Sequence, residues 1–298
     1  MEHASPFALA AVAASGAAVL AVAIGIVGYV ALSYAFMLAH VQRRRMSVLL
    51  REALRELGWA VLTQPVMPFF YLAGRRLSRG RGPVPIVAVH GYMQNRVDFL
   101  RIAGACGRAG LGPVYGFNYP WFGSIRANAD RLARFVDEVR RETGAPQVDL
   151  VAHSLGGLVA MEFVHHDGGS RVRRAVTVAS PHAGVAWRGP IVGACGPEMR
   201  VGCEFLLERA ERAVPVPCLS VYSTHDNIVH PPQTSALARR GGVDRAVEDV
   251  GHLAILFHRD TVRAVVSFLS VPVPGGGLPG GEPQSAVGLE PERELVGA

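Results

Sequence analysis

The longest feature of the hydropathy pattern is an uncharged stretch near the N-terminus. Residues 7–39 contain no charged side chain, whereas about 20 apolar residues suffice to cross a bilayer. Gly16, Gly25 and Gly28 lie within the stretch, and membrane helices tolerate such glycines. A cleaved signal peptide is the alternative, but it normally has a basic start and an apolar core of about 7–15 residues. The pattern therefore predicts an uncleaved transmembrane anchor over residues 1–40.

A basic amphipathic segment follows. Residues 41–72 have helical spacing of apolar positions and include Trp59 and a run rich in Pro and aromatic residues at 65–71. Residues 43–81 hold nine arginines against two glutamates, which suits anionic lipid headgroups. We predict a juxtamembrane segment and linker over 41–82 at the headgroup level, with a stalk packed on the next domain as the alternative. The positive-inside rule places the chain after the anchor in the cytoplasm.

From residue 83 the pattern changes to short apolar runs that alternate with helical periodicity. The helix predicted over 125–142 has apolar residues at Leu132, Val136 and Val139. Predicted strands cover 86–89, 114–119, 147–152, 175–179, 218–222 and 246–250, and a helix over 261–269 closes the domain. This alternation indicates an α/β fold, a mostly parallel sheet with helices on both faces. The domain is expected to end at 270, and the Pro-, Gly- and Glu-rich residues 271–298 are predicted to be a disordered tail.

Composition and charge narrow the possible partners. The chain has 298 residues, 50% of them hydrophobic, enough for one catalytic domain with a large core plus appendages. Its formal net charge is +6, but no nucleic-acid motif accompanies the arginines, so we expect a membrane and not nucleic acid as partner. The four cysteines fit no zinc spacing. Cys195 and Cys203 can pair in an oxidising compartment and are otherwise expected to be buried free thiols.

The candidate chemistry begins at residues 147–160, where an apolar strand meets the sequence His-Ser-Leu-Gly-Gly and then a helix-forming run. A serine at such a sharp turn has a strained backbone and an accessible hydroxyl, and only small residues fit two positions before and after it. Ala152 and Gly156 meet that requirement. An ordinary serine in a strand-to-helix loop is the alternative. The pattern favours Ser154 as a nucleophile.

A serine nucleophile needs a histidine base and a carboxylate that orients the base. After this kind of turn the acid comes next along the chain and the histidine last. Asp226 directly follows the strand 218–222, and His252 lies between the last strand and the closing helix, so both fall at the sheet edge where ligands bind. We therefore predict a triad of Ser154, Asp226 and His252. The weaker candidates are Asp244 and Asp249 as acids, and His225 and His230 as bases.

The negative charge of a tetrahedral intermediate calls for preorganised N–H donors. One is expected from the residue after the nucleophile, Leu155, and one from the loop after the first domain strand. Because Gly91 permits a close approach in that loop, we assign the second donor to the N–H of Tyr92. The residues predicted to support the site are His90, Gly91, His153 and Gly156. The sequence indicates no metal ligand set and no cofactor.

Four stretches together resemble the α/β-hydrolase superfamily, in its bacterial lipase and esterase group. They are HGY at 90–92, AHSLGG at 152–157, SPHAG at 180–184, and HDNIVHP at 225–231 followed by GHL at 251–253. The resemblance covers residues 84–270 and implies the α/β-hydrolase fold and the roles given above to the triad and the two donors. Ala152 departs from the usual G-x-S-x-G pattern. The family's calcium site is not carried over, because its ligands cannot be located.

Residues 185–215 fall where this family places its cap. Trp187, Phe205, Leu206 and Leu207 suit either an acyl pocket or core packing. The resemblance predicts a serine hydrolase that cleaves carboxylic esters, of lipids or other acyl compounds, through an acyl-serine intermediate. With the anchor predicted at residues 1–40, the hydrolase is expected to be membrane-anchored. The alternatives are an acyltransferase or thioesterase with the same triad, and a catalytically inactive membrane scaffold.

Overall fold

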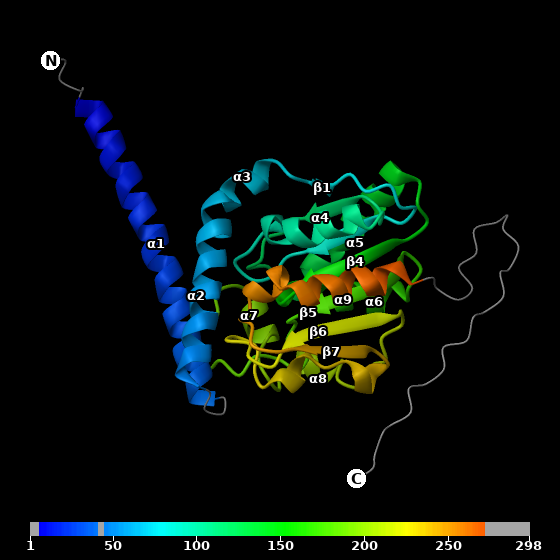
Figure 1. Ribbon diagram of the computed structural model, residues 1–298. Helices are drawn as coiled ribbons and strands as arrows, with labels where there is room; N and C mark the ends of the chain where they lie inside the picture. The colour runs from blue at the N-terminus through cyan, green and yellow to red at the C-terminus, as the bar shows by residue number, and fades with distance from the viewer. Residues whose placement is uncertain (1–5, 41–44, 272–298) are drawn as a thin grey trace, which may run out of the picture.

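The computed structural model describes residues 6–40 and 45–271, and the side chains of residues 20–39 and 45–271. In this range the chain forms a seven-stranded sheet covered by helices, preceded by two long N-terminal helices (Figure 1). The predicted α/β architecture is therefore confirmed. The predicted tail, apart from Val271, lies outside the described residues.

The strand order is β1-β3-β2-β4-β5-β6-β7, and all neighbouring strands are parallel except β1 and β3. The strands are β1 Arg76–Ser78, β2 Ile86–Val89, β3 Val114–Phe117, β4 Val148–His153, β5 Val172–Val178, β6 Cys218–Ser223 and β7 Val243–Val247. Strands β2, β3 and β4 are buried along their whole lengths. Helices on both faces of a parallel sheet cause this burial, which explains the continuous apolar runs in the sequence.

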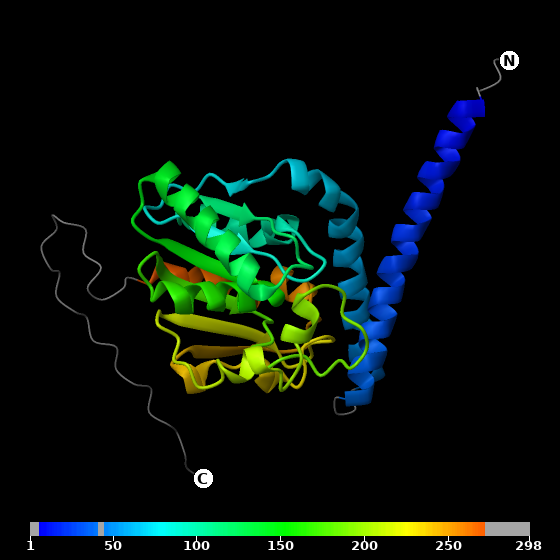
Figure 2. The same cartoon turned by 180° about the vertical axis from the view of Figure 1, so that it is seen from behind.

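Two helices cover each face of the sheet. Helices α4 (Leu100–Arg108) and α9 (Arg259–Ser270) lie in front of it in Figure 1, and α5 (Ile125–Thr143) and α6 (Leu155–Asp167) lie in front of it in Figure 2. The short helices are α3 Met67–Leu72, α7 Cys195–Glu198 and α8 Glu204–Leu207, and the 3₁₀ helices are η1 Gln64–Val66, η2 Arg96–Phe99, η3 Pro232–Ser235, η4 Ala238–Arg240 and η5 Ala254–Phe257. The buried apolar side chains accordingly form one core against α5 and α6 and another against α4 and α9.

Helix α5 shows how local sequence sets these elements. The Ser124 hydroxyl accepts a hydrogen bond from the N–H of Ala127, which satisfies one of the unpaired amides of the first turn. Leu132 and Val136 are buried one turn apart on the face that meets the core, as their spacing predicts. The helix ends at Gly144, whose φ of 71° is a conformation that glycine adopts without steric cost.

The two N-terminal helices form an antiparallel pair beside the domain (Figures 1 and 2). We call them together the helical hairpin; it consists of α1 (Pro6–His40) and α2 (Met46–Thr63). Buried Tyr34 and Met37 of α1 pack against buried Leu49 of α2. Residues Leu20–Ala39 of α1 are apolar enough and long enough to cross a membrane.

Helix α2 also packs on the α/β domain. Ala60 is only 2% exposed and joins the core against α4 and α9. The ring of Trp59 stacks on that of Phe257, with 3.9 Å between the ring centroids. The predicted segment 41–82 therefore contacts the domain directly, as the stalk alternative required.

The sheet differs from the sequence prediction at both edges. Strand β1 adds residues 76–78 to the sheet by pairing with β3, so the sheet begins before the expected domain start at residue 83. The strand was not predicted, because the three residues Arg-Leu-Ser are too few and too polar to show an apolar pattern in the sequence. Strand β7 covers 243–247 instead of 246–250, because it is an exposed edge strand whose sequence lacks the continuous apolar run of the central strands.

Cys195 and Cys203 are free thiols in this structure. The Sγ of Cys195 donates to the carbonyl oxygen of Trp121, and that of Cys203 donates to the carbonyl oxygen of Glu198. Cys195 is buried as expected for a free thiol, whereas Cys203 is half-buried.

Candidate active site

Ser154 occupies the turn between β4 and α6. Its φ of 53° and ψ of −126° are unusual for a residue with a side chain and mark the strain expected of a nucleophile at a strand-to-helix turn. The backbone passes so close here that a Cβ atom on Gly156 would lie 2.4 Å from the carbonyl oxygens of both Val89 and His90. The requirement for a small residue at position 156 is therefore steric, as the sequence suggested.

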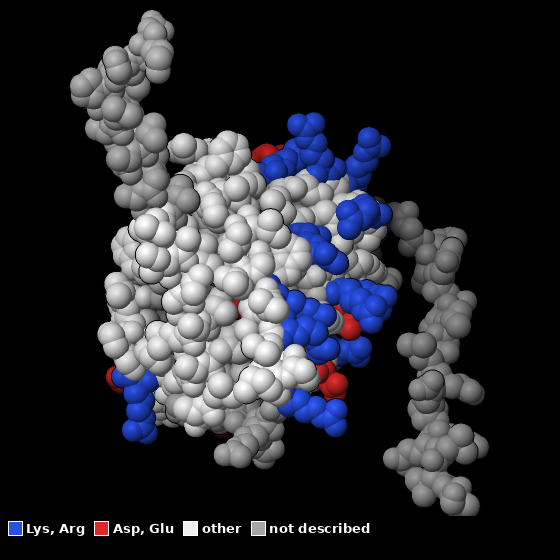
Figure 3. Space-filling model, turned by 60° about the vertical axis from the view of Figure 1, so that its left-hand side comes forward, with Lys and Arg blue, Asp and Glu red and all other residues white. Residues whose placement is uncertain are grey.

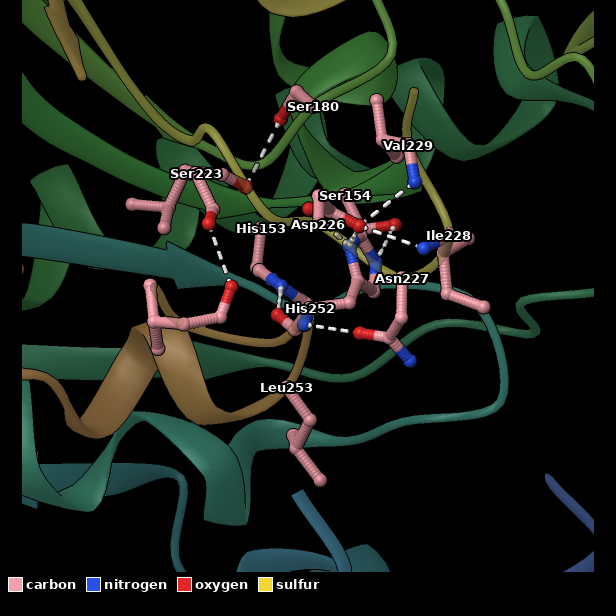
Figure 4. Close-up of polar contacts among 12 residues, drawn as sticks. His153, Ser154, Ser180, Ser223, Asp226, Asn227, Ile228, Val229, His252 and Leu253 are labelled. Atoms are coloured by element: carbon pink, nitrogen blue, oxygen red, sulfur yellow. Dashed lines mark hydrogen bonds and ion pairs between the residues drawn. The ribbon is translucent and has the colours of Figure 1, made fainter. Parts of the chain in front are cut away.

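The structure brings the side chains of Ser154, His252 and Asp226 together (Figure 4). The Nε2 of His252 lies 2.9 Å from the Oγ of Ser154. Its Nδ1 lies 2.9 and 3.0 Å from the two carboxylate oxygens of Asp226. All three residues are at least nine-tenths buried. This alcohol–imidazole–carboxylate series has the connectivity that serine nucleophiles use.

The strand ends supply the two partners of the serine. Asp226 follows β6, and its Oδ1 accepts hydrogen bonds from the N–H groups of Ile228 and Val229, which fix the carboxylate. His252 follows β7, and its backbone N–H donates to the Oδ1 of Asn227 across 2.7 Å. The loops after two adjacent parallel strands thus meet at the carboxyl edge of the sheet.

The rival residues have other contacts. The Nδ1 of His225 lies 3.0 Å from the Oδ1 of Asp249, so these two form a separate pair. Asp244 accepts the N–H of Leu237. The ring of His230 packs against Phe36 of α1, with 4.7 Å between ring centroids. The structure does not bring any of these groups to the Ser154 hydroxyl in the manner of His252.

Electrostatics favour a basic imidazole at position 252. Burial by itself lowers the pKa of His252, but the charge and hydrogen bond of Asp226, with a further contribution from Glu56, outweigh burial and raise the pKa above 6.5. Burial lowers the pKa of the neighbouring His153 well below 6.5, and the charge of His252 adds to that effect. One histidine is thus tuned to accept a proton, while its neighbour is held neutral.

His153 and His90 support the loops of the site. The Nε2 of His153 lies 3.0 Å from the carbonyl oxygen of His252, and its Nδ1 lies 2.7 Å from the Oε1 of Gln94. The Nδ1 of His90 lies 2.9 Å from the carbonyl oxygen of Gly91, and burial lowers the pKa of His90 to about 4. Both rings therefore act as neutral connectors between segments.

The two expected oxyanion donors lie in segments that flank Ser154. Leu155 is the first residue of α6, where backbone N–H groups have no acceptor within the helix. The loop that carries Tyr92 touches the serine: a Cβ on Gly91 would lie 2.9 Å from the Cβ of Ser154. The Tyr92 hydroxyl donates to the carbonyl oxygen of Val192, which anchors this loop. The N–H of Tyr92 remains a predicted donor.

The four apolar residues singled out in the segment 185–215 have different surroundings. Phe205 and Leu206 are buried and belong to the core against α5 and α6, whereas Leu207 is 63% exposed. Trp187 instead meets the helical hairpin, where its ring contacts that of Phe36 edge-on at 4.9 Å between centroids. Core packing therefore accounts for Phe205 and Leu206.

Three residues that contact the site were not singled out in the sequence. They are Gln94, which joins His153 to the N–H of Gly91; Asn227, which accepts the N–H of His252; and Glu56, which accepts the N–H of Leu253. Asn227 adjoins Asp226, and this adjacency was the only local signal.

Among the residues that the structure describes, no three His, Cys, Asp or Glu side chains gather as a metal-binding cluster.

Comparisons with known proteins bear on the fold that carries this site. Residues 84–194 match a family model described as alpha/beta hydrolase fold. Lipase B of Aspergillus fumigatus superimposes with a TM-score of 0.55 at 18% identity over 63% of this chain, which spans about half (52%) of the fungal protein. A mature lipase of Bacillus licheniformis gives a TM-score of 0.53 at 17% identity, with 63% of this chain and 92% of the other covered. At these identities the similarity concerns the fold.

Proposed function

Because residues 84–194 match an alpha/beta hydrolase family model and the chain shares its fold with lipases and esterases, we propose that it is an α/β-hydrolase and acts as a membrane-anchored serine hydrolase. Its substrates are carboxylic esters, cleaved through an acyl intermediate on Ser154. The observation that carries the proposal is the hydrogen-bonded series Ser154–His252–Asp226, with distances of 2.9 Å at both of its links. The strained backbone of Ser154 supports the same role.

In the first half of the reaction, the Oγ of Ser154 attacks the ester carbonyl carbon. The serine proton passes to the Nε2 of His252, and the Asp226 carboxylate stabilises the imidazolium that forms. The carbonyl oxygen becomes an oxyanion, which the N–H groups of Leu155 and Tyr92 stabilise. His252 then gives its proton to the departing alkoxide, the carbon–oxygen bond breaks, and the alcohol leaves an acyl-Ser154 ester.

In the second half, water replaces the alcohol. His252 takes a proton from the water as its oxygen attacks the acyl carbon, and the same two donors stabilise the second oxyanion. The Oγ of Ser154 leaves with the proton returned by His252, and the carboxylic acid is released. The enzyme returns to its starting state, and one water molecule has been consumed.

The helical hairpin supports the proposed membrane location. Helix α1 has 35 residues, which at 1.5 Å each give a length of about 52 Å, against about 30 Å for the hydrocarbon core. Among the described residues, a broad face of the molecule in Figure 3 carries few charged side chains. Helices α1, α2 and α3 carry exposed apolar side chains, among them Leu20, Ile24, Val27 and Leu32 of α1, Leu54 and Leu62 of α2, and Phe69 and Leu72 of α3. Such a surface fits a lipid environment.

We assign lipid or other long-chain acyl esters as the substrate class, because the hairpin reaches the site. Phe36 of α1 contacts both Trp187 and His230, which belong to the loops around the triad. A substrate dissolved in the bilayer would meet the domain at this point. The arginines that follow α1 favour a cytoplasmic location for the domain.

The decisive experiment is labelling with a fluorophosphonate, which reacts with activated serines. The full-length protein in detergent should be labelled, and Ser154→Ala should not. Ser170→Ala is the matched control, since Ser170 is an exposed serine in the turn after α6. Equal labelling of the wild type and Ser154→Ala would rule out this nucleophile.

Two further measurements test the finer assignments. The first measures activity on p-nitrophenyl esters of increasing chain length. Higher activity on long chains, with a further increase once the ester exceeds its solubility limit, supports a lipase. A preference for the acetate ester contradicts it. Protease added outside sealed cells should leave the domain intact if it is cytoplasmic. Digestion from outside would overturn that orientation.

A further inference from the structure

The side chain of Glu56 projects from α2 into the loop that carries His252. Its Oε1 accepts the N–H of Leu253 and its Oε2 accepts the N–H of Ala254, both at 2.8 Å. Glu56 has 0% exposure. Ala254 begins η5, and the N–H groups at such a start have no acceptor within the helix. The hairpin thus supplies the acceptors that the chain needs directly after His252.

The contact extends to the residue before His252. A Cβ atom on Gly251 would lie 2.6 Å from the Oε2 of Glu56 and 2.9 Å from the hydroxyl of Tyr34. The hydroxyl of Tyr29 donates to the Oε1 of Glu56 at 3.3 Å. The carboxylate and two tyrosines of the hairpin therefore enclose the backbone on both sides of His252.

A second link joins the hairpin to the same histidine. The Nδ2 of Asn227 donates to the Oγ of Ser33 in α1 across 2.7 Å, and all of these groups are buried. The Oδ1 of the same Asn227 accepts the backbone N–H of His252 across 2.7 Å. The loops of Asp226 and His252 are thus both tied to the two N-terminal helices (Figure 4 shows the domain side of these contacts).

Glu52 provides a comparison within the same helix. It lies one turn before Glu56 and is equally buried, but its carboxylate pairs with Arg51 and Arg55 of α2 itself. Glu56 instead has backbone amides of the catalytic loop as partners. A buried carboxylate is costly unless hydrogen bonds compensate it, so the position of Glu56 and that of the loop depend on each other.

We propose that Glu56 is a positioning residue for the catalytic histidine. It holds the backbone of residues 251–254 so that the imidazole of His252 stays between Ser154 and Asp226, and its negative charge favours the imidazolium formed during the reaction. The inference rests on the proposed function of the triad. It makes the helical hairpin part of the catalytic apparatus as well as a membrane attachment.

The test compares Glu56→Gln with Glu52→Gln in the full-length protein in detergent micelles. The glutamine amide offers one acceptor where the loop presents two N–H groups, so the loop shifts. We expect kcat for p-nitrophenyl butyrate to fall about 10²-fold, the scale of loss for a misplaced catalytic group, with KM little changed. Glu52→Gln should keep the wild-type kcat.

A pH profile separates positioning from general destabilisation. Burial raises the pKa of Glu56, and the hydrogen bonds from the N–H groups of Leu253 and Ala254 oppose that shift. In the pH range where Glu56 is ionised its charge favours protonated His252, so the loss of this charge should move the acidic limb of kcat/KM to lower pH. A purely structural role would lower the amount of active protein without moving the limb. The other titratable groups around this pair are Asp226 and His153 beside His252, and Tyr29, Tyr34 and Asp98 beside Glu56.

Each outcome decides the proposal. An unchanged kcat and an unmoved acidic limb in Glu56→Gln would overturn it. If that variant does not fold, Gly251→Ala replaces it, since its Cβ displaces the carboxylate without removing it, and wild-type kcat in Gly251→Ala would be equally fatal. Absence of turnover and of fluorophosphonate labelling in the wild type would instead refute the proposed function, and the inference with it.

Discussion

Gly91 and Ser154 lie so close together that a single added methyl group at position 91 would sit 2.9 Å from the Cβ of the serine. The same atom would lie 2.4 Å from the Oε1 of Gln94. The loop after β2 is therefore pressed against the nucleophile, and its own conformation depends on having no side chain at this residue.

Gly91→Ala should displace the loop and, with it, the N–H of Tyr92. Loss of one oxyanion donor costs about 10²–10³ in kcat in other enzymes, and we expect a fall of that size with a folded protein. Ester turnover and circular dichroism measure the two effects. Gly104→Ala is the control, because a Cβ there would meet only the end of Arg108 at 3.4 Å. Wild-type turnover in Gly91→Ala would contradict this role of the loop.

Asp226→Asn tests the acid of the proposed triad. Asp226 raises the pKa of His252, and His252 must be unprotonated to act as base, so wild-type kcat/KM should fall as pH drops through a value above 6.5. Removing the charge should shift this limb to lower pH. The asparagine amide also favours the wrong tautomer of the histidine, so kcat should fall by about 10⁴-fold, the size of the loss in other triads.

The control for this experiment is Asp244→Asn, which changes the rival carboxylate of the sequence. Asp244 accepts backbone N–H groups of Leu237 and Ala238, away from the triad. We expect near wild-type turnover from it. The opposite pattern, with Asp244→Asn inactive and Asp226→Asn active, would reassign the acid.

The sequence reveals some of this arrangement because certain requirements are local. The turn at Ser154 needs small neighbours, and that need appears directly as Ala152 and Gly156. Parallel strands end at one edge of the sheet, so Asp226 and His252 could be placed near Ser154 without knowing any contact.

Other parts depend on contacts between distant segments and leave no local pattern. Glu56 meets Leu253, 197 positions further along the chain. In the sequence it is one of two glutamates among the nine arginines of residues 43–81. Gln94 meets His153 across 59 positions. Strand β1 is three residues long and was assigned to a linker, because its pairing with β3 fixes it more than its own composition does.

Glu162→Gln tests a buried ion pair that joins the serine helix α6 to the segment after α8. Glu162 and Arg209 form two hydrogen bonds of 2.6 and 2.8 Å, and their side chains are 1% and 8% exposed. Without Glu162, the buried Arg209 keeps only the partly exposed Glu208 carboxylate and the Phe205 carbonyl oxygen as partners. The free energy of unfolding should therefore fall by up to about 3–5 kcal/mol. Urea denaturation measures it.

Two further changes serve as comparisons for the loss of unfolding free energy in Glu162→Gln. Glu138→Gln removes a pair with Arg75 in which both side chains are nearly half exposed, and such pairs contribute about 0–1 kcal/mol. Replacing both members of the buried pair, as Glu162→Leu with Arg209→Met, should restore much of the lost stability, since apolar replacements of a buried pair are often neutral. A loss below about 0.5 kcal/mol in Glu162→Gln would show that solvent already screens the pair.

Asp98 should make the stability of the protein depend on pH. Burial raises the pKa of this carboxyl to about 7, with Thr63 opposing the shift and Glu56 adding to it. A raised folded-state pKa means that the stabilisation from the protonated acid is complete below pH 4 and is lost as pH rises to about 7. Asp98→Asn removes this loss. The free energy of unfolding of the variant minus that of wild type should therefore be more favourable at pH 8 than at pH 4 by up to roughly 4 kcal/mol.

Thermal unfolding at the two pH values measures the change, and Asp130→Asn on the exposed face of α5 is the control. An equal difference between Asp98→Asn and wild type at both pH values would mean that folding does not raise the pKa of Asp98, contrary to what its burial requires.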